Sequence, residues 1–402
     1  MLWQPSLPDR YTRANPDDLA RDIAARREEL GEKLVILGHH YQTDEVIRHA
    51  DFTGDSLKLS QTAARVASER DVRWVVFCGV HFMAETADML TPEQVQVILP
   101  DLSAGCSMAD MAAYDDTVEA WESLRAGLAD HGWEGRIIPI TYVNSTAAIK
   151  AFVGAHGGAC CTSSNADKVF AWAMAGGAEP RDDEEDVKIL FLPDQHLGRN
   201  TAARYGIDTA HHTSVFDPRL ARRGAPLGGM SQAQLLASRA VLWAGHCSVH
   251  KLFRPEHCDQ IRALPGEPYR ILVHPECCKE VVDKSDLAGS TEFIIRTIRS
   301  APAGSRWAVG TEHHLVGRLS REARSRGVEV RILSDCQCLC TTMFRIDQPH
   351  LLWVLDHLAG AHSKDRSPKV VNAVRVHPGV RRDALLALQR MLDLAPAPAV
   401  VD

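Results

Sequence analysis

The stretch KLVILGHHYQ, residues 33–42, joins a short apolar run to a cluster of histidine, tyrosine and glutamine. Further runs rich in Val, Ile and Leu, most of them without alternation, are RWVVFCG (73–79), VQVILP (95–100), RIIPITYV (136–143), VKILFLP (187–193), AVLWAG (240–245), YRILVHP (269–275), RWAVG (306–310) and VEVRIL (328–333). Such runs are typical of parallel strands that are covered on both faces. Helix-length segments with apolar spacing of three and four, such as 56–70, separate them and predict βαβ units in an α/β fold.

Three of these predicted strands end in polar side chains that can take part in catalysis or ligand binding, in GHHYQ (38–42), TYVNS (141–145) and VHPEC (273–277). Each is followed at a distance by a cysteine, and the separations from Tyr41 to Cys106 and from His274 to Cys340 are nearly equal. The middle separation, which ends at Cys247, is longer. Three similar α/β units around a shared centre would explain this layout, and two domains with a chance resemblance would also fit.

The bulk composition favours a small-molecule enzyme. The chain has 402 residues, a formal net charge of −7 at pH 7 and no dense block of Lys or Arg, so we expect no nucleic-acid partner. The N-terminus lacks the apolar core of a signal peptide, and the longest apolar runs fall far short of the ~20 residues of a membrane helix. We therefore expect a soluble, cytoplasmic protein without a membrane partner.

Eleven cysteines, an odd number, argue against a disulfide framework in such a location. We expect Cys78, Cys160 and Cys258 to be buried apolar residues. The densest group is DCQCLCTTM (335–343), in which cysteines alternate. By itself this pattern fits half of a zinc site, a redox pair or chance.

One thiolate from this group, together with Cys106 and Cys247, makes a more natural ligand set. Both of those cysteines follow a small loop that bears Gly and Ala after a predicted strand. Three thiolates without a fourth would leave one iron of a 4Fe–4S cluster open, and an open iron can act as a Lewis acid.

Ligands of open α/β sheets bind beyond the carboxyl ends of the strands. A lone histidine there is more often a loop residue, but the residues at the three strand ends form a rich group: His39, His40, Tyr41, Tyr142, Asn144, His274 and Glu276. Three predicted helix starts, in GDSLKLS (54–60), TSSNADK (162–168) and GSTEFI (289–294), offer N–H groups to an anion. Ordinary N-capping, worth about 1 kcal/mol each, is the alternative for Ser56, Ser163, Ser290 and Thr291.

The chain resembles the quinolinate synthase family over roughly residues 31–356. The matching stretches, in order, are HHYQ (39–42), GDSLKLS (54–60), FCGVHFMAETA (77–87), AGCSMADM (104–111), TYVNSTAAIKA (141–151), CTSSNA (161–166), FLPDQHLGRNTA (191–202), WAGHCSVH (243–250), VHPECCKEVV (273–282), GSTEFI (289–294), GTEHH (310–314) and CLCTTMFRIDQPHLLW (338–353). Their order and co-occurrence make the resemblance specific.

The resemblance implies three similar three-layer α/β/α domains with parallel sheets, in a pseudo-threefold arrangement around a central active site. We expect them at 1–115, 116–255 and 256–345, with a C-terminal helical segment, 346–402, packing on the first. It also implies a 4Fe–4S cluster held by one cysteine from each domain: Cys106, Cys247 and Cys340. The implied reaction, in de novo NAD biosynthesis, condenses iminoaspartate with dihydroxyacetone phosphate to give quinolinate, phosphate and two waters. L-aspartate oxidase is the implied functional partner that supplies iminoaspartate.

By the same resemblance, the acid–base residues are His39, Tyr41, Tyr142, His274 and Glu276, and the substrate-binding residues are Ser56, Asn144, Ser163 and Thr291. Met343 is expected to pack against the cluster. The chain departs from the family at the C-x-C-x-C group, where some members have C-x-x-C, so no regulatory disulfide is expected from Cys336 and Cys338. It also has Gln195 where some members carry lysine, and Phe344 where Asn is common.

Other functions compete with this interpretation. A zinc-dependent lyase or aldolase would use the same thiols and histidines and would be colourless and stable in air. An iron–sulfur carrier or sensor would bind a cluster without turnover. If the metal prediction fails altogether, a phosphosugar-binding α/β enzyme is the fallback.

Overall fold

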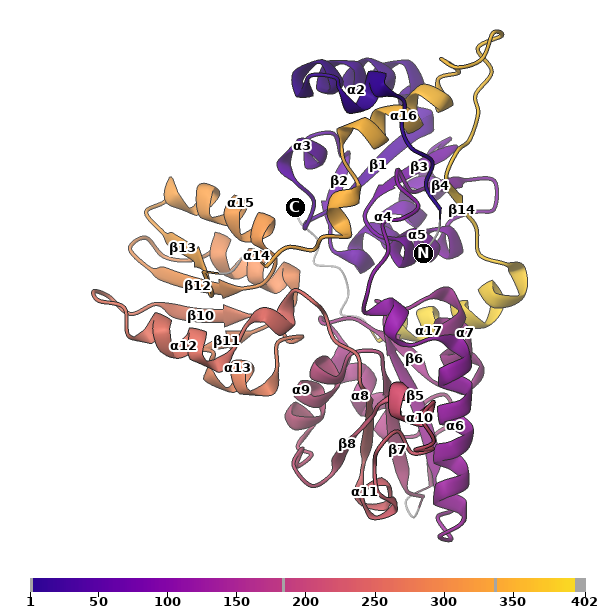
Figure 1. Ribbon diagram of the computed structural model, residues 1–402, viewed down its shortest axis with the longest axis vertical. Coiled ribbons are helices and arrows are strands. Elements are labelled where there is room, and N and C mark those ends of the chain that lie inside the picture. Colours follow the sequence, from indigo (N-terminus) through magenta and orange to yellow (C-terminus); the bar gives the residue numbers. More distant parts are fainter. Residues whose placement is uncertain (1–2, 183–184, 336–337, 395–402) are drawn as a thin grey trace. The chain divides into compact units, whose positions relative to one another are not determined.

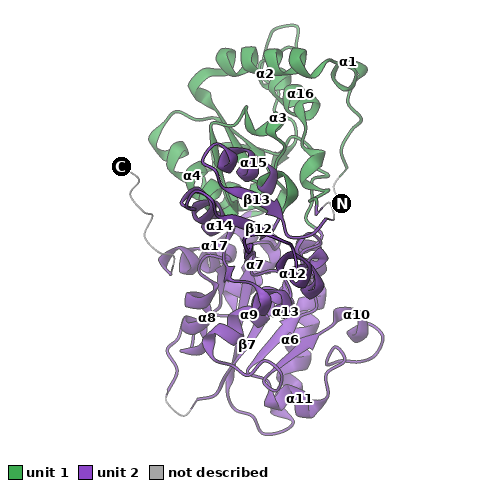
Figure 2. Ribbon diagram, turned by 90° about the vertical axis from the view of Figure 1, so that its left-hand side faces the viewer, with its two compact units in different colours: residues 1–106, 312–315, 339–377 green, residues 107–311, 316–338, 378–402 purple. Residues whose placement is uncertain are grey.

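The computed structural model describes residues 3–182, 185–335 and 338–394. The chain forms two compact units, coloured separately in Figure 2. Unit 1 comprises residues 1–106, 312–315 and 339–377, and unit 2 comprises residues 107–311, 316–338 and 378–402. In the described ranges, no helix is long and apolar enough to cross a membrane.

Unit 1 contains a sheet with the strand order β14-β4-β3-β1-β2 (Figure 1). Neighbouring strands are parallel except for the antiparallel pair of β14 and β4. Every residue of β1 and β3 is buried, as expected of strands covered on both faces. The strands are β1 (Leu34–His39), β2 (Phe52–Gly54), β3 (Trp74–Cys78), β4 (Gln96–Ile98) and β14 (Ala373–Val374).

The helices of unit 1 cover this sheet, and α2 and α16 pack against each other. Helix α2 begins with Pro16, and the side chain of Asn15 accepts a hydrogen bond from the Asp17 N–H, which fixes its start. The helices of this unit are α1 (Asp9–Thr12), α2 (Pro16–Leu30), η1 (Gly31–Lys33), α3 (Asp44–Ile47), α4 (Ser56–Glu69), α5 (His81–Leu90), η4 (Met343–Arg345) and α16 (Gln348–Leu358).

Unit 2 contains two sheets, of order β6-β5-β7-β9-β8 and β11-β10-β12-β13, whose neighbouring strands are parallel. The strands of the first are β5 (Arg136–Tyr142), β6 (Ala159–Cys161), β7 (Val187–Leu192), β8 (Thr213–Phe216) and β9 (Ala240–Trp243). Those of the second are β10 (Arg270–Val273), β11 (Leu287–Ala288), β12 (Arg306–Gly310) and β13 (Glu329–Ile332).

The remaining helices belong to unit 2, apart from the first residues of α15, which lie in unit 1. They are η2 (Ala109–Met111), α6 (Tyr114–Ala129), α7 (Ala147–Ala155), α8 (Ala166–Met174), α9 (Gln195–Tyr205), α10 (Pro218–Ala221), α11 (Gln232–Ala237), η3 (His250–Leu252), α12 (Pro255–Arg262), α13 (Lys279–Lys284), α14 (Thr291–Arg299), α15 (His313–Arg324) and α17 (Pro378–Asp393).

The sheets share one strand order. In each sheet the first three strands along the chain stand in the order second, first, third, and a later strand pairs with the third, as in β2-β1-β3-β4, β6-β5-β7-β9 and β11-β10-β12-β13. In the first two sheets a further strand is added beyond this later strand. This repetition confirms the prediction of similar α/β units with largely parallel sheets.

The sheet of β1 and the sheet of β10 also share a pattern of two hydrogen bonds. The carboxylate of Asp51 accepts the Ile36 N–H at 2.7 Å, and the Asp51 N–H donates to the Ile36 carbonyl at 2.7 Å. Asp286 and Ile271 make the same two bonds, at 2.6 and 2.9 Å. Both pairs are separated by 15 residues and tie the start of a second strand to the first, so the sheets of β1 and β10 repeat each other in detail.

Helix α17 packs on α7 and β6 of unit 2 at very short range. A Cβ built on Gly154 of α7 would lie 1.9 Å from the carbonyl oxygen of Asp383 in α17, so only glycine permits this approach. The Arg390 guanidinium donates to the carbonyls of Gly154 and Gly158. The sequence-based division has a C-terminal helical segment, 346–402, packing on the first domain; of this segment, α17 lies in unit 2. The other domain boundaries stay predictions.

Candidate active site

The shared strand order explains where polar side chains gather. In an open sheet that contains the order 2-1-3, the connections leave in opposite directions from strands one and three, and a crevice forms outside their carboxyl ends. His39 ends β1, Tyr142 ends β5 and His274 directly follows β10, so these residues all lie at the end of a first strand. The three candidate cysteines follow β4, β9 and β13, the strands that pair with the third strand of each sheet.

Glu276 is the centre of a buried hydrogen-bonded group in unit 2. Its Oε2 lies 2.6 Å from Nδ1 of His250, and Tyr142 donates a further hydrogen bond to the same carboxylate. Nε2 of His250 lies 3.1 Å from Oγ1 of Thr311. The four side chains come from the ends of β5, β10 and β12 and from η3, and all are buried. Tyr142, Glu276, His250 and Thr311 therefore form one continuous chain of hydrogen bonds.

The ionised form of Glu276 is favoured by this group. Burial works to raise the pKa of its carboxyl, but the neighbouring His250 and His274, with the hydrogen bonds from His250 and Tyr142, lower the pKa overall. A carboxylate is only an acceptor, so Nδ1 of His250 is the donor. In a neutral ring Nε2 then accepts from the Thr311 hydroxyl.

His274 stacks on His250, with ring centroids 4.5 Å apart and an interplanar angle of 15°. Its Nδ1 accepts the Glu276 N–H at 3.3 Å, which leaves the proton of the neutral ring on Nε2. Burial, against the attraction of Glu276, lowers the pKa of His274 to about 3. The ring is therefore neutral near pH 7 and can donate from Nε2.

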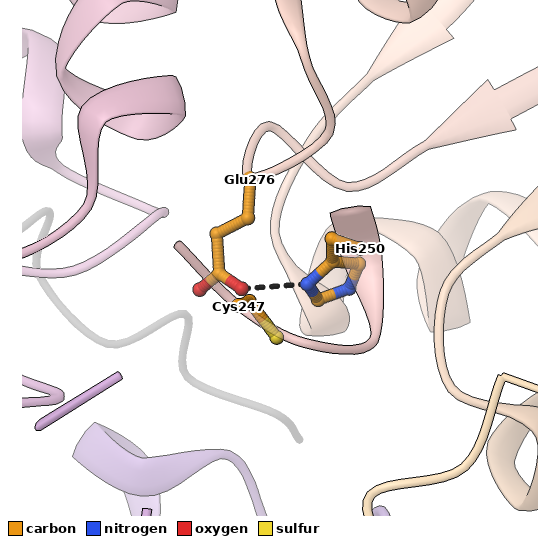
Figure 3. A group of neighbouring side chains, drawn as sticks. All are labelled: Cys247, His250 and Glu276. Carbon is orange, nitrogen blue, oxygen red and sulfur yellow. Dashed lines mark hydrogen bonds and ion pairs between the residues drawn. The ribbon is translucent and has the colours of Figure 1, made fainter. Parts of the chain in front are cut away.

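Cys247 lies beside this group. Ligand atoms of Cys247, His250 and Glu276 all lie within 4.8 Å of one another, and Figure 3 shows their side chains converging from η3 and the loop before it and from the loop after β10. Thiolate, imidazole and carboxylate are all metal-ligating groups. This unit thus contains a cysteine-bearing group that suits a metal.

Asn144 carries an unsatisfied polar atom two residues after β5. Its Oδ1 is buried and has no hydrogen-bond partner among the described residues. Such a group costs about 1–3 kcal/mol when left unpaired, so an N–H or O–H of a bound molecule would be stabilised there.

The serine and threonine candidates lie at helix starts, as predicted, but they differ in role. Ser290 is the N-cap of α14, since its side chain accepts the Phe293 N–H, and Thr291 is the first helical residue. In α4 the cap is Asp55, and Ser56 follows it. Ser163 lies in the turn before α8 and is partly exposed. Local capping thus accounts for Ser290, whereas Ser56, Ser163 and Thr291 do not serve as caps.

In unit 1, His39 and Tyr41 repeat the arrangement of His274 and Glu276. Nδ1 of His39 accepts the Tyr41 N–H at 3.1 Å, and the two rings meet edge to face with centroids 4.8 Å apart. His39 is buried and Tyr41 is partly exposed. A histidine whose Nδ1 binds the N–H two residues further on is therefore found at the ends of both β1 and β10.

The cysteines divide by exposure in a way that fits a metal centre. Cys106, Cys247 and Cys340 are each partly exposed, as is Cys278, whereas Cys78, Cys160 and Cys258 are buried, as expected. Burial raises the pKa of the Cys340 thiol, so its deprotonation would be coupled to binding a metal. Cys338 is buried, and Cys336 lies outside the described residues.

Two members of the hydrogen-bonded group were not predicted from the sequence. His250 stands three residues after Cys247, and this C-x-x-H spacing in GHCSVH was the available signal. Thr311 directly follows β12, and its signal was its place in the matching stretch GTEHH (310–314).

Comparisons with known proteins identify the family. A family model described as "Quinolinate synthetase A protein" matches residues 21–393. Quinolinate synthase of Acidobacterium capsulatum is 49% identical over 387 residues, which cover 96% of this chain and 95% of that protein. Quinolinate synthase of Nocardioides sp. is 49% identical, with 95% and 90% covered, and that of Anoxybacillus flavithermus is 47% identical, with 98% of each covered. The chain therefore belongs to the quinolinate synthase family.

Proposed function

We propose that this chain condenses iminoaspartate with dihydroxyacetone phosphate to give quinolinate, phosphate and two waters, in the cytoplasm and as a step of NAD biosynthesis. The proposal rests on the family and, above all, on the buried group of Tyr142, Glu276 and His250 beside Cys247. L-aspartate oxidase would supply the unstable imine. A reducing compartment suits a chain with eleven cysteines.

Cys106, Cys247 and Cys340 would hold a 4Fe–4S cluster. Their partial exposure and their common place after the strand that pairs with the third strand of each sheet support this ligand set. When bound, such a cluster with three thiolate ligands supplies a Lewis-acidic iron that polarises a substrate oxygen.

The protein side chains would supply the proton transfers. The condensation removes a proton from the iminoaspartate carbon that bonds to the triose, and each dehydration adds a proton to a departing hydroxyl group. Glu276, held ionised by two donors, is suited to accept the proton. The Tyr142 hydroxyl, bonded to the same carboxylate, is suited to return it to the departing oxygen.

The polar groups around this pair would orient the substrates. The Asn144 amide oxygen would accept an N–H or O–H of the substrate. Neutral His274 would donate from Nε2 without adding charge. Ser56, Ser163 and Thr291, next to helix starts, would bind carboxylate or phosphate oxygens. His39 and Tyr41 would complete the acid–base set.

The experiment is anaerobic purification or reconstitution, followed by iron and acid-labile sulfide analysis and a quinolinate assay. We expect about four iron and four sulfide per chain. With L-aspartate, L-aspartate oxidase and dihydroxyacetone phosphate, quinolinate should form in proportion to the cluster. A loaded protein that makes no quinolinate would contradict the activity, and a chain that takes no iron would contradict the cofactor.

A zinc enzyme is the second candidate, because the Cys247–His250–Glu276 group offers a donor set that zinc accepts. The 2.6 Å contact between Nδ1 of His250 and Oε2 of Glu276 weighs against it, since these two atoms bind each other. Zinc in stoichiometric amount in an active, colourless and air-stable protein would favour this candidate.

A further inference from the structure

Helix α9 and the residue before it contact two loops of unit 2, the loop that carries Cys247 and the loop that carries Glu276. The motif PDQHLGRN, residues 193–200, spans the end of β7 and the first turns of α9. Its role is not explained by the proposed chemistry, because neither Asp194 nor Asn200 belongs to the acid–base group. Both side chains are buried, and both bind main-chain groups of segments distant in the sequence.

Asp194 holds the loop that carries Cys247. Its Oδ1 accepts the N–H groups of His196 and Leu197 at 2.7 and 2.8 Å, which caps α9. Its Oδ2 accepts the N–H of Cys247 at 3.2 Å. The two oxygens therefore have separate tasks, one for the helix and one for the main chain of the cysteine.

The main chain reinforces this contact. Asp194 and Gly245 form a parallel β-bridge, and the Gln195 N–H donates to the Gly245 carbonyl at 3.0 Å. A Cβ built on Gly245 would lie 2.2 Å from the Pro193 carbonyl oxygen, so the two segments approach at a distance that only glycine allows. The loop of Cys247 is thereby fixed at Gly245 and again at Cys247 itself.

Asn200 holds the loop that carries Glu276. Its Nδ2 donates to the carbonyls of Pro275 and Cys277, at 2.8 and 2.9 Å. These two residues flank Glu276 on either side. A side-chain amide has two N–H groups on one nitrogen, so a single Asn200 satisfies both carbonyls, which a carboxylate cannot do.

We propose that Asp194 and Asn200 are positioning residues, one for the metal ligand Cys247 and the other for the base Glu276. The assignment of Cys247 and Glu276 rests on the proposed function. Neither positioning residue contacts the reacting atoms. Each fixes the main chain of a functional residue, so that α9 sets both relative to the same helix.

Substitutions of Asp194 and Asn200 separate the two tasks. In Asp194→Asn the side chain keeps one accepting oxygen, so it can cap α9 or bind the Cys247 N–H but not both. Asp194→Ser retains an oxygen for the cap and is too short to reach Cys247. In Asn200→Asp the donors are replaced by acceptors that face two carbonyls. Asp217→Asn is the control, because Asp217 caps α10 and accepts the Arg219 N–H, and none of the hydrogen bonds of the described residues joins its side chain to the loops of Cys247 or Glu276.

The test compares the rate at which a chelator removes metal from anaerobically reconstituted variants. Asp194→Asn and Asp194→Ser should release metal about 10–100-fold faster than wild type, as is common when a group supporting a ligand is lost. Asn200→Asp should retain metal but lose about 10–100-fold in kcat, with a smaller change in KM. Asp217→Asn should match wild type in both measurements.

Thermal unfolding of each variant separates positioning from general stability. Metal release at the wild-type rate by folded Asp194→Ser would overturn the role of Asp194. Wild-type kcat in Asn200→Asp, or loss of metal and turnover together, would overturn the role of Asn200. Because metal release is measured without substrate and with whichever metal the wild type holds, failure of the proposed reaction leaves the test of Asp194 intact.

Discussion

Nδ1 of His250 lies 2.6 Å from Oε2 of Glu276, with both side chains almost wholly buried. A buried carboxylate is costly unless donors stabilise it, and here His250 and Tyr142 supply them. The pair therefore holds a base ionised in a site that water does not reach easily. This relationship sets the direction of the first two predictions.

Removing the donor or the base of this group should stop turnover without removing the metal. Tyr142→Phe removes the hydroxyl and Glu276→Gln removes the base, and both variants keep every cysteine. We expect turnover to fall about 10²–10⁴-fold, as is usual for the loss of an acid or base. Quinolinate formation per bound iron is the measurement, and normal turnover in both variants would remove them from the mechanism.

Replacing His250 should move the pH dependence of activity. His250 lowers the pKa of Glu276, so His250→Ala should raise that pKa toward or above the usual value of a glutamate. The base works in its ionised form. As the pH falls, the variant should therefore lose activity at a higher pH than wild type does. The measurement is kcat/KM against pH.

Thr311→Val is the graded control for His250, because it removes only the partner of Nε2 and should give a smaller displacement. If kcat/KM falls at the same acidic pH in wild type and in His250→Ala, the claim that His250 lowers the pKa of the catalytic Glu276 is contradicted.

Each ligand cysteine should be indispensable to the metal. Cys106→Ser, Cys247→Ser and Cys340→Ser should each hold only a small fraction of the wild-type iron, because a serine oxygen replaces thiolate poorly. Cys258→Ser is the matched control, since burial raises the pKa of that thiol and it lies in α12, away from the strand ends. Iron per chain after identical reconstitution is the readout, and a wild-type value in any of the first three excludes that residue as a ligand.

Much of the fold followed from local pattern. Apolar runs without alternation marked strands such as β1, β5 and β10 because parallel strands are buried on both faces. The strand order was not predictable, since it depends on which neighbours pair across the sheet rather than on any single run. The short strands β2, β6 and β11 were likewise missed as strands, because two or three residues carry too little periodicity.

Site residues that lie next to a recognisable strand were predictable from the sequence. Residues that join the site only through folding were not. His274 and Glu276 follow a recognisable strand, and the structure places both at its end. His250 and Thr311 become significant only when the ends of β9 and β12 are brought to Glu276. Asp194 was not predicted, because an aspartate before a helix fits ordinary capping, and only the distant N–H of Cys247 reveals its second contact.

Because α7 and α17 are in close contact, adding a single methyl group at Gly154 should lower the free energy of unfolding markedly. Gly154→Ala places a methyl group against the α17 backbone, where relief requires the helices to separate. We expect a loss of about 1–3 kcal/mol in the free energy of unfolding. Gly317→Ala is the control, because its Cβ would meet only the end of the Arg321 side chain at 3.6 Å and alanine favours a helix. Equal unfolding midpoints of the two variants in denaturant would contradict this account.

The same contact has a consequence for how the chain is synthesised. Residues of α7 (Ala147–Ala155) leave the ribosome long before those of α17 (Pro378–Asp393). Throughout that interval the face of α7 that receives α17 lacks its cover, and the apolar side of the nascent sheet stays open to other chains. Folding of this unit is completed only after α17 has been synthesised, so slow synthesis, or truncation before α17, exposes the protein to aggregation.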